Sequence, residues 1–390
     1  MYPTVLAACI VAQMGLPETS GQGTERQKIV SSPLSGEVVL IGKGTLQVLG
    51  RLRADAHVQR TERDTVAYIA LSPVEREVVV VVEREVNYGE MNDPRAVLFP
   101  VTNLLFTWDE QTRGFTGSID MKSDGSPAAA YSPSRRSMVV GCWGETQVSF
   151  WDMARRTKVR SVDVELPKNP GPLAGFFDSI SCVAASGDGS YAAVGGYGSY
   201  SKIRLMDGAS GMTVCYLPTE FGKFGDVTCL EFGSGHTFLA AGRSDGIVDL
   251  WDVPNRRILN HCVGDAHQIN DVDFTRDGSQ LATSCNGGEV RVWDVPSGRA
   301  KRVLEGHRGA VSSVAFSPDG DTLATGGSDG TVGVWDVAAG VEISRVNCPH
   351  AVGTGVRSLA FSQDGTRLYA ADGDGVLIFG AKRKRQTQDR

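Results

Sequence analysis

Residues 306–336 read GHRGAVSSVAFSPDGDTLATGGSDGTVGVWD, and this stretch decides the fold. Apolar and small residues alternate from Val311 to Phe316, which is typical of a half-buried strand. Ser317-Pro318-Asp319-Gly320 predicts a tight turn, because Asp-Gly supplies the positive φ that such hairpins require. A second turn at Ser328-Asp329-Gly330 precedes the closing Trp-Asp pair. The unit predicts four short strands, over residues 311–316, 322–325, 332–335 and 341–346.

Copies of this unit recur along the chain. Residues 266–294 read AHQINDVDFTRDGSQLATSCNGGEVRVWD and end in Trp-Asp, as the first unit does. Seven units end at related positions, which are Trp108, Trp151, Met206, Trp251, Trp293, Trp335 and Phe379. Consecutive positions are 43, 55, 45, 42, 42 and 44 residues apart. Four strands in a repeat of about 40–45 residues ending in Trp-Asp predict the blades of a β-propeller.

These motifs resemble the WD-repeat family, over residues 40–380 or thereabouts. The resemblance implies an all-β fold, a seven-bladed β-propeller of four-stranded antiparallel blades. It also implies a hydrogen-bonded tetrad within a blade, made of a His, a Ser or Thr, an Asp and the Trp. All four occur in one unit, as His307, Thr325, Asp329 and Trp335. The unit ending at Asp294 has Gly287 in place of the Asp, and the unit ending at Asp252 has Ala241 in place of the Ser or Thr.

The two ends of the chain are predicted to meet in the last blade. An open ring would leave strand edges unpaired, and residues 381–385 (AKRKR) are too charged for a buried fourth strand. Residues 45–49 (TLQVL) have the right composition to complete that blade. We therefore expect a flexible segment with a candidate export signal over 1–36, the propeller over 37–380 and a basic tail over 381–390.

Composition narrows the class of function. The net charge of −6 and the pI of about 5.6 argue against a nucleic-acid-binding surface, because phosphate binding needs a positive field. No apolar run reaches the 18 residues that a membrane-spanning helix needs. The eight cysteines include no C-x-x-C pair and no zinc-ligand spacing, so we expect free thiols, no metal and no cofactor.

The N-terminus leaves localisation open between two interpretations. Residues 5–12 form a short apolar stretch that is compatible with an export signal, but no Lys or Arg precedes it. We expect a cytoplasmic protein. The alternative is a chain that is exported or membrane-anchored through this short segment.

Three stretches depart from the repeat, and function in repeat scaffolds resides in such loops. They cover residues 83–103, 166–179 and 217–225, and all three are predicted to open on the same face of the disc. They carry six aromatic residues that suit a partner-binding surface: Tyr88, Phe99, Phe176, Phe177, Phe221 and Phe224. The alternative is that these loops pack on the disc and bury the aromatics themselves.

Turns on the opposite face are rich in arginine. The arginines predicted there are Arg113, Arg135, Arg136, Arg155, Arg156, Arg256, Arg257 and Arg276. Aspartates such as Asp277 and Asp319 share that face, so we expect a solvated surface of mixed charge rather than an anion site.

Catalytic motifs are missing from the sequence. It contains no G-x-S-x-G elbow, no H-E-x-x-H helix and no phosphate-binding G-x-x-x-x-G-K-[ST] loop. We therefore expect a non-catalytic scaffold that binds protein partners through the irregular loops of one face. The alternative is an exported or lipid-anchored propeller that binds a small ligand or a surface polymer. The sequence identifies neither the partner nor the oligomeric state.

Overall fold

The computed structural model describes part of the 390-residue chain. The described residues are 46–53, 64–72, 77–85, 101–109, 115–121, 126–143, 145–164, 179–198, 202–217, 225–233, 237–264, 267–348, 355–372 and 375–381. Within these ranges every regular element is a strand. None of the described residues forms a helix of the length and apolarity needed to cross a bilayer.

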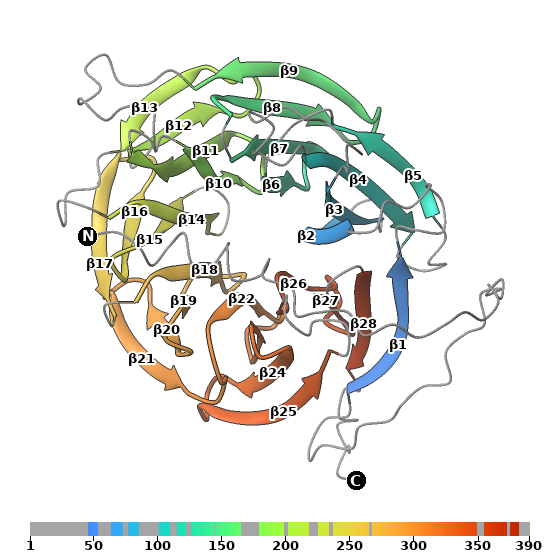
Figure 1. Ribbon diagram of the computed structural model, residues 1–390. Helices are drawn as coiled ribbons and strands as arrows, with labels where there is room; N and C mark the ends of the chain where they lie inside the picture. Colours follow the sequence, from blue (N-terminus) through green and yellow to red (C-terminus); the bar gives the residue numbers. More distant parts are fainter. Residues whose placement is uncertain are drawn as a thin grey trace, which may run out of the picture.

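Seven four-stranded antiparallel sheets form a ring around a central axis (Figure 1). The first three blades contain β2 (Asp64–Ser72), β3 (Glu77–Glu85), β4 (Val101–Asp109) and β5 (Phe115–Asp120); β6 (Pro127–Ser132), β7 (Ser137–Cys142), β8 (Gln147–Asp152) and β9 (Thr157–Asp163); and β10 (Ser179–Ala185), β11 (Tyr191–Tyr197), β12 (Ile203–Asp207) and β13 (Thr213–Leu217). In each blade the first strand lies nearest the axis and the fourth lies at the rim (Figure 1).

The next three blades follow the repeat closely. They contain β14 (Val227–Phe232), β15 (Phe238–Arg243), β16 (Ile247–Asp252) and β17 (Arg257–Val263); β18 (Ile269–Phe274), β19 (Gln280–Cys285), β20 (Val290–Asp294) and β21 (Arg299–Leu304); and β22 (Val311–Phe316), β23 (Thr322–Gly327), β24 (Thr331–Asp336) and β25 (Val341–Asn347). The predicted strands of the sixth blade therefore match the observed ones to within one or two residues. The seven predicted unit ends all fall in third strands, which confirms the blade count.

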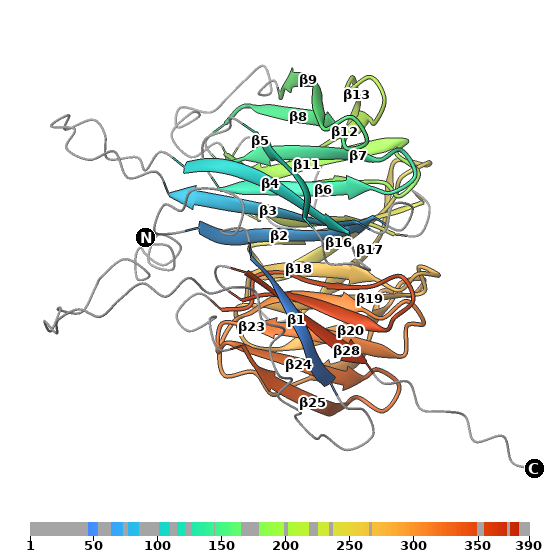
Figure 2. The ribbon, with the colours of Figure 1, turned by 90° about the vertical axis from the view of Figure 1, so that its right-hand side faces the viewer.

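The N-terminal strand closes the ring, as predicted. The seventh blade contains β26 (Leu359–Phe361), β27 (Arg367–Ala371) and β28 (Gly375–Ala381), and β1 (Leu46–Arg53) is its fourth strand. The antiparallel pairing runs from Leu46 opposite Ala381 to Arg53 opposite Gly375. Figure 2 shows β1 lying along β28 at the side of the disc. The pairing is longer than expected from residues 45–49, because the strand continues to Arg53 and β28 includes Ala381.

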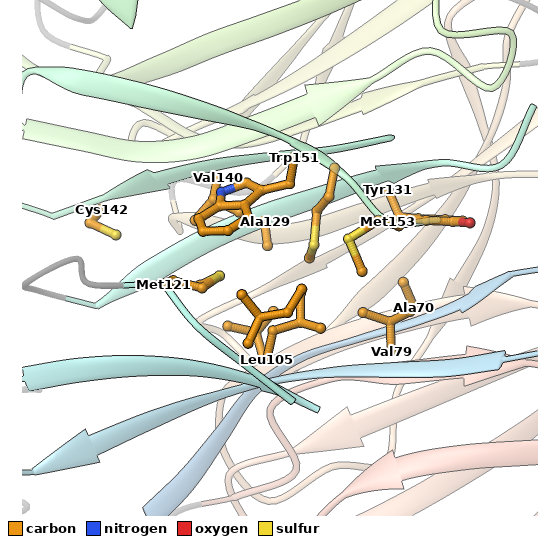
Figure 3. Close-up of a cluster of buried hydrophobic side chains, with 13 residues drawn as sticks. Ala70, Val79, Leu105, Met121, Ala129, Tyr131, Val140, Cys142, Trp151 and Met153 are labelled. Atoms are coloured by element: carbon orange, nitrogen blue, oxygen red, sulfur yellow. The ribbon is translucent and has the colours of Figure 1, made fainter. Parts of the chain in front are cut away.

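Side chains between neighbouring blades form the hydrophobic core. One such cluster joins Leu105 and Val79 of the first blade to Met138, Val140 and Trp151 of the second (Figure 3). Comparable clusters lie between other neighbouring blades, including one between the seventh and the first. Because each blade buries its faces only against its neighbours, the complete ring is what makes the core continuous.

Candidate functional site

Consecutive strands of a blade are antiparallel, so each connection between strands opens on one of the two faces of the disc. Connections from second to third strands, and those between blades, open on one side of the disc, which we call the loop face. Connections from first to second and from third to fourth strands open on the other, the turn face. The three irregular stretches belong to the loop face by this topology, as predicted from the sequence.

The bounds of the irregular stretches need correction. Strand β3 continues to Glu85 and β4 begins at Val101, so the first departure is 86–100 rather than 83–103. Ser179 begins β10 and Leu217 ends β13, so those residues are not in loops. Pairing across the blade extends these strands beyond the point where the sequence pattern fades. The predicted partner-binding aromatics all lie outside the described residues: Tyr88, Phe99, Phe176, Phe177, Phe221 and Phe224.

One aromatic pair on the loop face is described. Trp143 follows β7 and Tyr197 ends β11, so both side chains lie where second strands of neighbouring blades reach this face. Their ring centroids are 5.0 Å apart with planes at 66°, an edge-to-face contact. Trp143 is nevertheless 48% exposed. The sequence carries no signal for this pair, because the two residues are 54 positions apart and neither belongs to an irregular stretch.

The structure brings the four tetrad residues of the sixth blade together. Trp335 Nε1 donates a hydrogen bond to Thr325 Oγ1 over 2.9 Å, and Thr325 Oγ1 lies 2.7 Å from His307 Nε2. His307 Nδ1 lies 3.2 Å from both carboxylate oxygens of Asp329. Thr325 is fully buried, and the chain of bonds runs from the hydrophobic core to the loop face.

Electrostatics set the direction of these hydrogen bonds. Burial raises the pKa of Asp329, but hydrogen bonds from the Arg308 amide, Thr331 and His307 together lower it to about 2. Burial lowers the pKa of His307 despite the neighbouring Asp329. Asp329 is therefore ionised and can only accept, so Nδ1 of a neutral His307 carries the proton. Nε2 then accepts from the Thr325 hydroxyl, which in turn accepts from Trp335.

Two glycines make room for the His307 ring. A Cβ atom on Gly327 would collide with His307 Nδ1. A Cβ atom on Gly333 would lie 2.8 Å from Thr325 Oγ1, which is closer than real Cβ contacts allow. The tetrad thus depends on six positions rather than four, since the two facing residues must be small.

The fifth blade keeps only half of the tetrad. Trp293 Nε1 donates to Thr283 Oγ1 over 3.0 Å. His267 is exposed, and a Cβ atom on Gly287 would lie 2.9 Å from its Nδ1 atom. Cys285 and Arg291 occupy the positions of Gly327 and Gly333, so the space that holds His307 in the sixth blade is already filled.

An ionic network replaces the tetrad in the fourth blade. Arg243 stands at the position of Gly327, and its fully buried guanidinium lies 3.3 Å from Asp249 Oδ2 and 2.6 Å from Asp245 Oδ2. The other oxygen of Asp249 lies 2.8 Å from His261 Nδ1. Asp249 is itself completely buried, at the position of Gly333. A Cβ atom on Gly225 would collide with the guanidinium, so a glycine again makes the room.

Two indole groups lack the hydroxyl that Trp335 contacts. Trp151 Nε1 and Trp251 Nε1 are buried and have no hydrogen-bond partner among the described residues. Strand register explains both cases, because Val140 and Ala241 occupy the position of Thr325 in their blades. Figure 3 shows Val140 and Trp151 within one buried cluster. Each unpaired donor carries a desolvation penalty that the fifth and sixth blades avoid.

Seven first strands line a central channel with a cavity of about 460 Å³. Polar side chains in this lining bond to main-chain groups of the neighbouring blade. Ser181 donates to Val227 O over 2.7 Å, and Thr228 donates to Ile269 O over 2.6 Å. These bonds occupy main-chain groups that face the channel and would otherwise have no strand partner.

Between the fifth and sixth blades, Asn270 Nδ2 donates to Val311 O over 2.8 Å, and two carboxyl groups accept further main-chain bonds. Asp271 Oδ2 accepts from the Val314 amide over 3.0 Å, and Asp273 Oδ2 accepts from the Phe316 amide over 2.6 Å. Glu231 of the fourth blade lines the same cavity. The sequence carries no signal for these acidic residues, because alternation along a strand does not reveal what lies on the next blade.

The turn face has its own capping chemistry. The aspartate that ends a third strand accepts the main-chain amide three residues later, as with Asp294 and Ser297 over 3.1 Å. The hydrogen bond from the Ser297 hydroxyl lowers the pKa of Asp294, although burial opposes it. The same cap occurs at Asp152, Asp207, Asp252 and Asp336. The Asp of the Trp-Asp pair is therefore a turn cap.

An arginine in one of the turns of this face bonds to the neighbouring blade. Arg156 has φ +56°, where the sixth blade has Gly340 in the corresponding turn. Its guanidinium donates to Thr116 O over 2.5 Å and lies 3.3 Å from Glu77 Oε1 of the first blade. These contacts favour the mixed-charge interpretation of this face. Arg257 is the first residue of β17 rather than part of a turn, which corrects its predicted position.

Comparison with known proteins agrees with the repeat assignment. The family model described as WD domain, G-beta repeat matches residues 217–252, 258–294, 298–336 and 345–379. The first three matches end with β16, β20 and β24, and the fourth ends at Phe379 within β28, so each ends in a third strand of the last four blades. No curated protein matches the chain. Four matched repeats within a closed ring of seven four-stranded blades identify the chain as a WD-repeat β-propeller.

Proposed function

We propose that the chain is a non-catalytic scaffold that binds a protein partner through its loop face, at the second and third blades. WD-repeat propellers typically serve as protein-interaction scaffolds. The observation that carries the proposal is the Trp143–Tyr197 pair, which leaves a large indole 48% exposed on the face where the irregular stretches open.

An exposed indole suits this role for a physical reason. Trp and Tyr are enriched among the residues that dominate binding energy, because they bury a large rigid surface at low entropic cost. The edge contact with Tyr197 holds Trp143 in one orientation before any partner arrives, which reduces the entropic cost of binding. The stretch 165–178, which carries Phe176 and Phe177, connects β9 to β10 between the same two blades. We include those two residues in the proposed surface.

Affinity capture from native cell extract tests the proposal. The Trp143→Ala variant should lose its specific partners, with the affinity of a purified partner falling about 30-fold, the effect of a hot spot worth about 2 kcal/mol. The matched control is Met212→Ala, because Met212 is 70% exposed but lies on the turn face. Partners that survive Trp143→Ala, or that are lost equally with Met212→Ala, would rule out this face.

A further inference from the structure

Side-chain bonds between neighbouring first strands are neutral at most seams of the ring. Ser313 Oγ accepts from the Leu359 amide over 3.1 Å, joining the sixth blade to the seventh. Ser358 Oγ accepts from the Ile69 amide over 3.2 Å, joining the seventh blade to the first. The seam between the fifth and sixth blades differs, because Asp271 and Asp273 accept its two main-chain amides. In the next first strand, Ser313 occupies the position of Asp271 and Ala315 that of Asp273, so the seam between the sixth and seventh blades has no carboxyl group at either position.

Ionised carboxylates at this seam face an unfavourable environment. Burial raises the pKa of Asp271 to about 6 and that of Asp273 to about 7, although main-chain amides oppose the shift. Burial, followed by the charges of Asp273 and Asp271, raises the pKa of Glu231 well above its ordinary value. Among the described residues, no Lys or Arg lowers the pKa of these three carboxyl groups. Ionisation therefore places like charges together at buried positions beside the channel.

The other ionisable groups that face the seam do not neutralise it. Tyr68 of β2 lies within electrostatic range of Glu231 and Asp271, and burial raises its pKa, so it stays neutral. The thiol of Cys229 on β14 is also buried, and its pKa is raised well above the ordinary value. Arg357, two residues before β26, lines the same cavity and is exposed.

We propose that the seam between the fifth and sixth blades is a pH-responsive joint of the ring, closed when Asp271, Asp273 and Glu231 are protonated and loosened when they ionise. The direction follows from linkage. A carboxyl group that is free in water has a pKa of about 3.9–4.3, below its value in the closed seam, so the closed seam binds more protons. Opening becomes more favourable as the pH rises from about 4 to about 7, by up to tenfold per pH unit for each group. Above about pH 7 the contributions of Asp271 and Asp273 level off.

Hydrogen exchange on the full chain tests the joint without any variant. Amides of β22, which include Val314 and Phe316, are compared with those of β26, which include Leu359, at about pH 5 and about pH 7.5 with the intrinsic rates corrected. We expect protection in β22 to fall more than about tenfold relative to β26. Equal changes in both strands, or no change in β22, would overturn the proposal.

Isosteric variants separate the charge from the hydrogen bond. Asp273→Asn keeps an oxygen that can accept from the Phe316 amide but cannot ionise, so we expect the pH dependence of β22 protection to shrink. Ser358→Ala is the control, because Ser358 Oγ accepts from the Ile69 amide between the seventh and first blades, so the variant weakens a different seam without removing a titratable group. An unchanged pH dependence in Asp273→Asn together with Asp271→Asn would contradict the assignment to these carboxyls.

Discussion

The fourth and sixth blades solve the same packing problem with different chemistry. Between the second and third strands of the sixth blade, the ring of neutral His307 fills the space above two glycines and links Trp335 to Asp329 through Thr325. In the fourth blade, Arg243 and Asp249 stand at the positions of the glycines and fill the space themselves. The sixth blade thus buries a chain of neutral groups that ends at an ionised carboxylate, and the fourth buries an ion pair.

The difference shows what a blade requires. Side chains must fill the space between the second and third strands, and the buried polar groups there need hydrogen-bond or ionic partners. Different sets of residues can meet both requirements. A buried ion pair contributes little net stability over an apolar replacement, whereas losing one member of the pair is costly. The fourth blade also leaves Trp251 Nε1 unpaired, which the sixth blade avoids through Thr325. The two solutions therefore have different weak points.

Removing one charge from the fourth blade should have the largest effect. Asp249→Ala leaves the fully buried guanidinium of Arg243 with only the partly exposed Asp245 as a partner. We expect the free energy of unfolding to fall by about 3–5 kcal/mol, measured by urea denaturation.

The double variant Arg243→Met/Asp249→Leu is the control for that prediction. It removes both charges, so the loss should be smaller than in Asp249→Ala. If Asp249→Ala lowers the free energy of unfolding by less than about 1 kcal/mol, the ion pair does not stabilise this blade.

Removing one hydroxyl from the sixth blade should have an intermediate effect. Thr325→Val leaves the indole of Trp335 without an acceptor and Nε2 of His307 without a donor. We expect a loss of about 1–3 kcal/mol, measured in the same denaturation series. Thr283→Val in the fifth blade is the matched comparison, because Thr283 accepts a hydrogen bond from Trp293 Nε1 while His267 is exposed. A loss in the fifth blade as large as that in the sixth would mean that His307 contributes nothing through Thr325.

Adding a hydroxyl to the second blade should have the smallest effect, and it should be stabilising. Val140→Thr is nearly isosteric. It places a hydroxyl acceptor at the position that corresponds to Thr325, which accepts the hydrogen bond from Trp335 in the sixth blade. Because Trp151 Nε1 is buried without a partner, we expect a gain of about 1 kcal/mol, seen as a rise in the urea midpoint. Val139→Thr, on the neighbouring position of the same strand, cannot reach that indole and should be destabilising. A loss in Val140→Thr as large as that in Val139→Thr would argue against the missing bond.

Much of the architecture was predictable because it depends on neighbours in the chain. The Asp319-Gly320 turn and the alternation over 311–316 are local patterns, and repeating them seven times predicts the ring. The tetrad residues could be aligned by position within one repeat. The closing strand followed from the need to pair an edge, and its pairing with β28 confirms it.

The site was less predictable because it depends on residues that are distant in the chain. His261 and Asp249 meet only because β16 pairs with β17 in one register. Trp143 and Tyr197 meet only because neighbouring blades stand side by side. Neither pair leaves a periodic signal in the sequence, since each depends on a contact that a single repeat does not contain.

By itself, the sequence determined the strands, the turns, the number of blades and the closure of the ring. Periodicity and turn chemistry act over a few residues, so each repeat carries that information in full. The tertiary structure decided which side chains fill each blade, which aromatic pair stands exposed on the loop face and which seam carries the carboxyls of Asp271 and Asp273. The reason is that burial, ion pairing and desolvation depend on groups from adjacent strands and blades, which only the closed ring brings into contact.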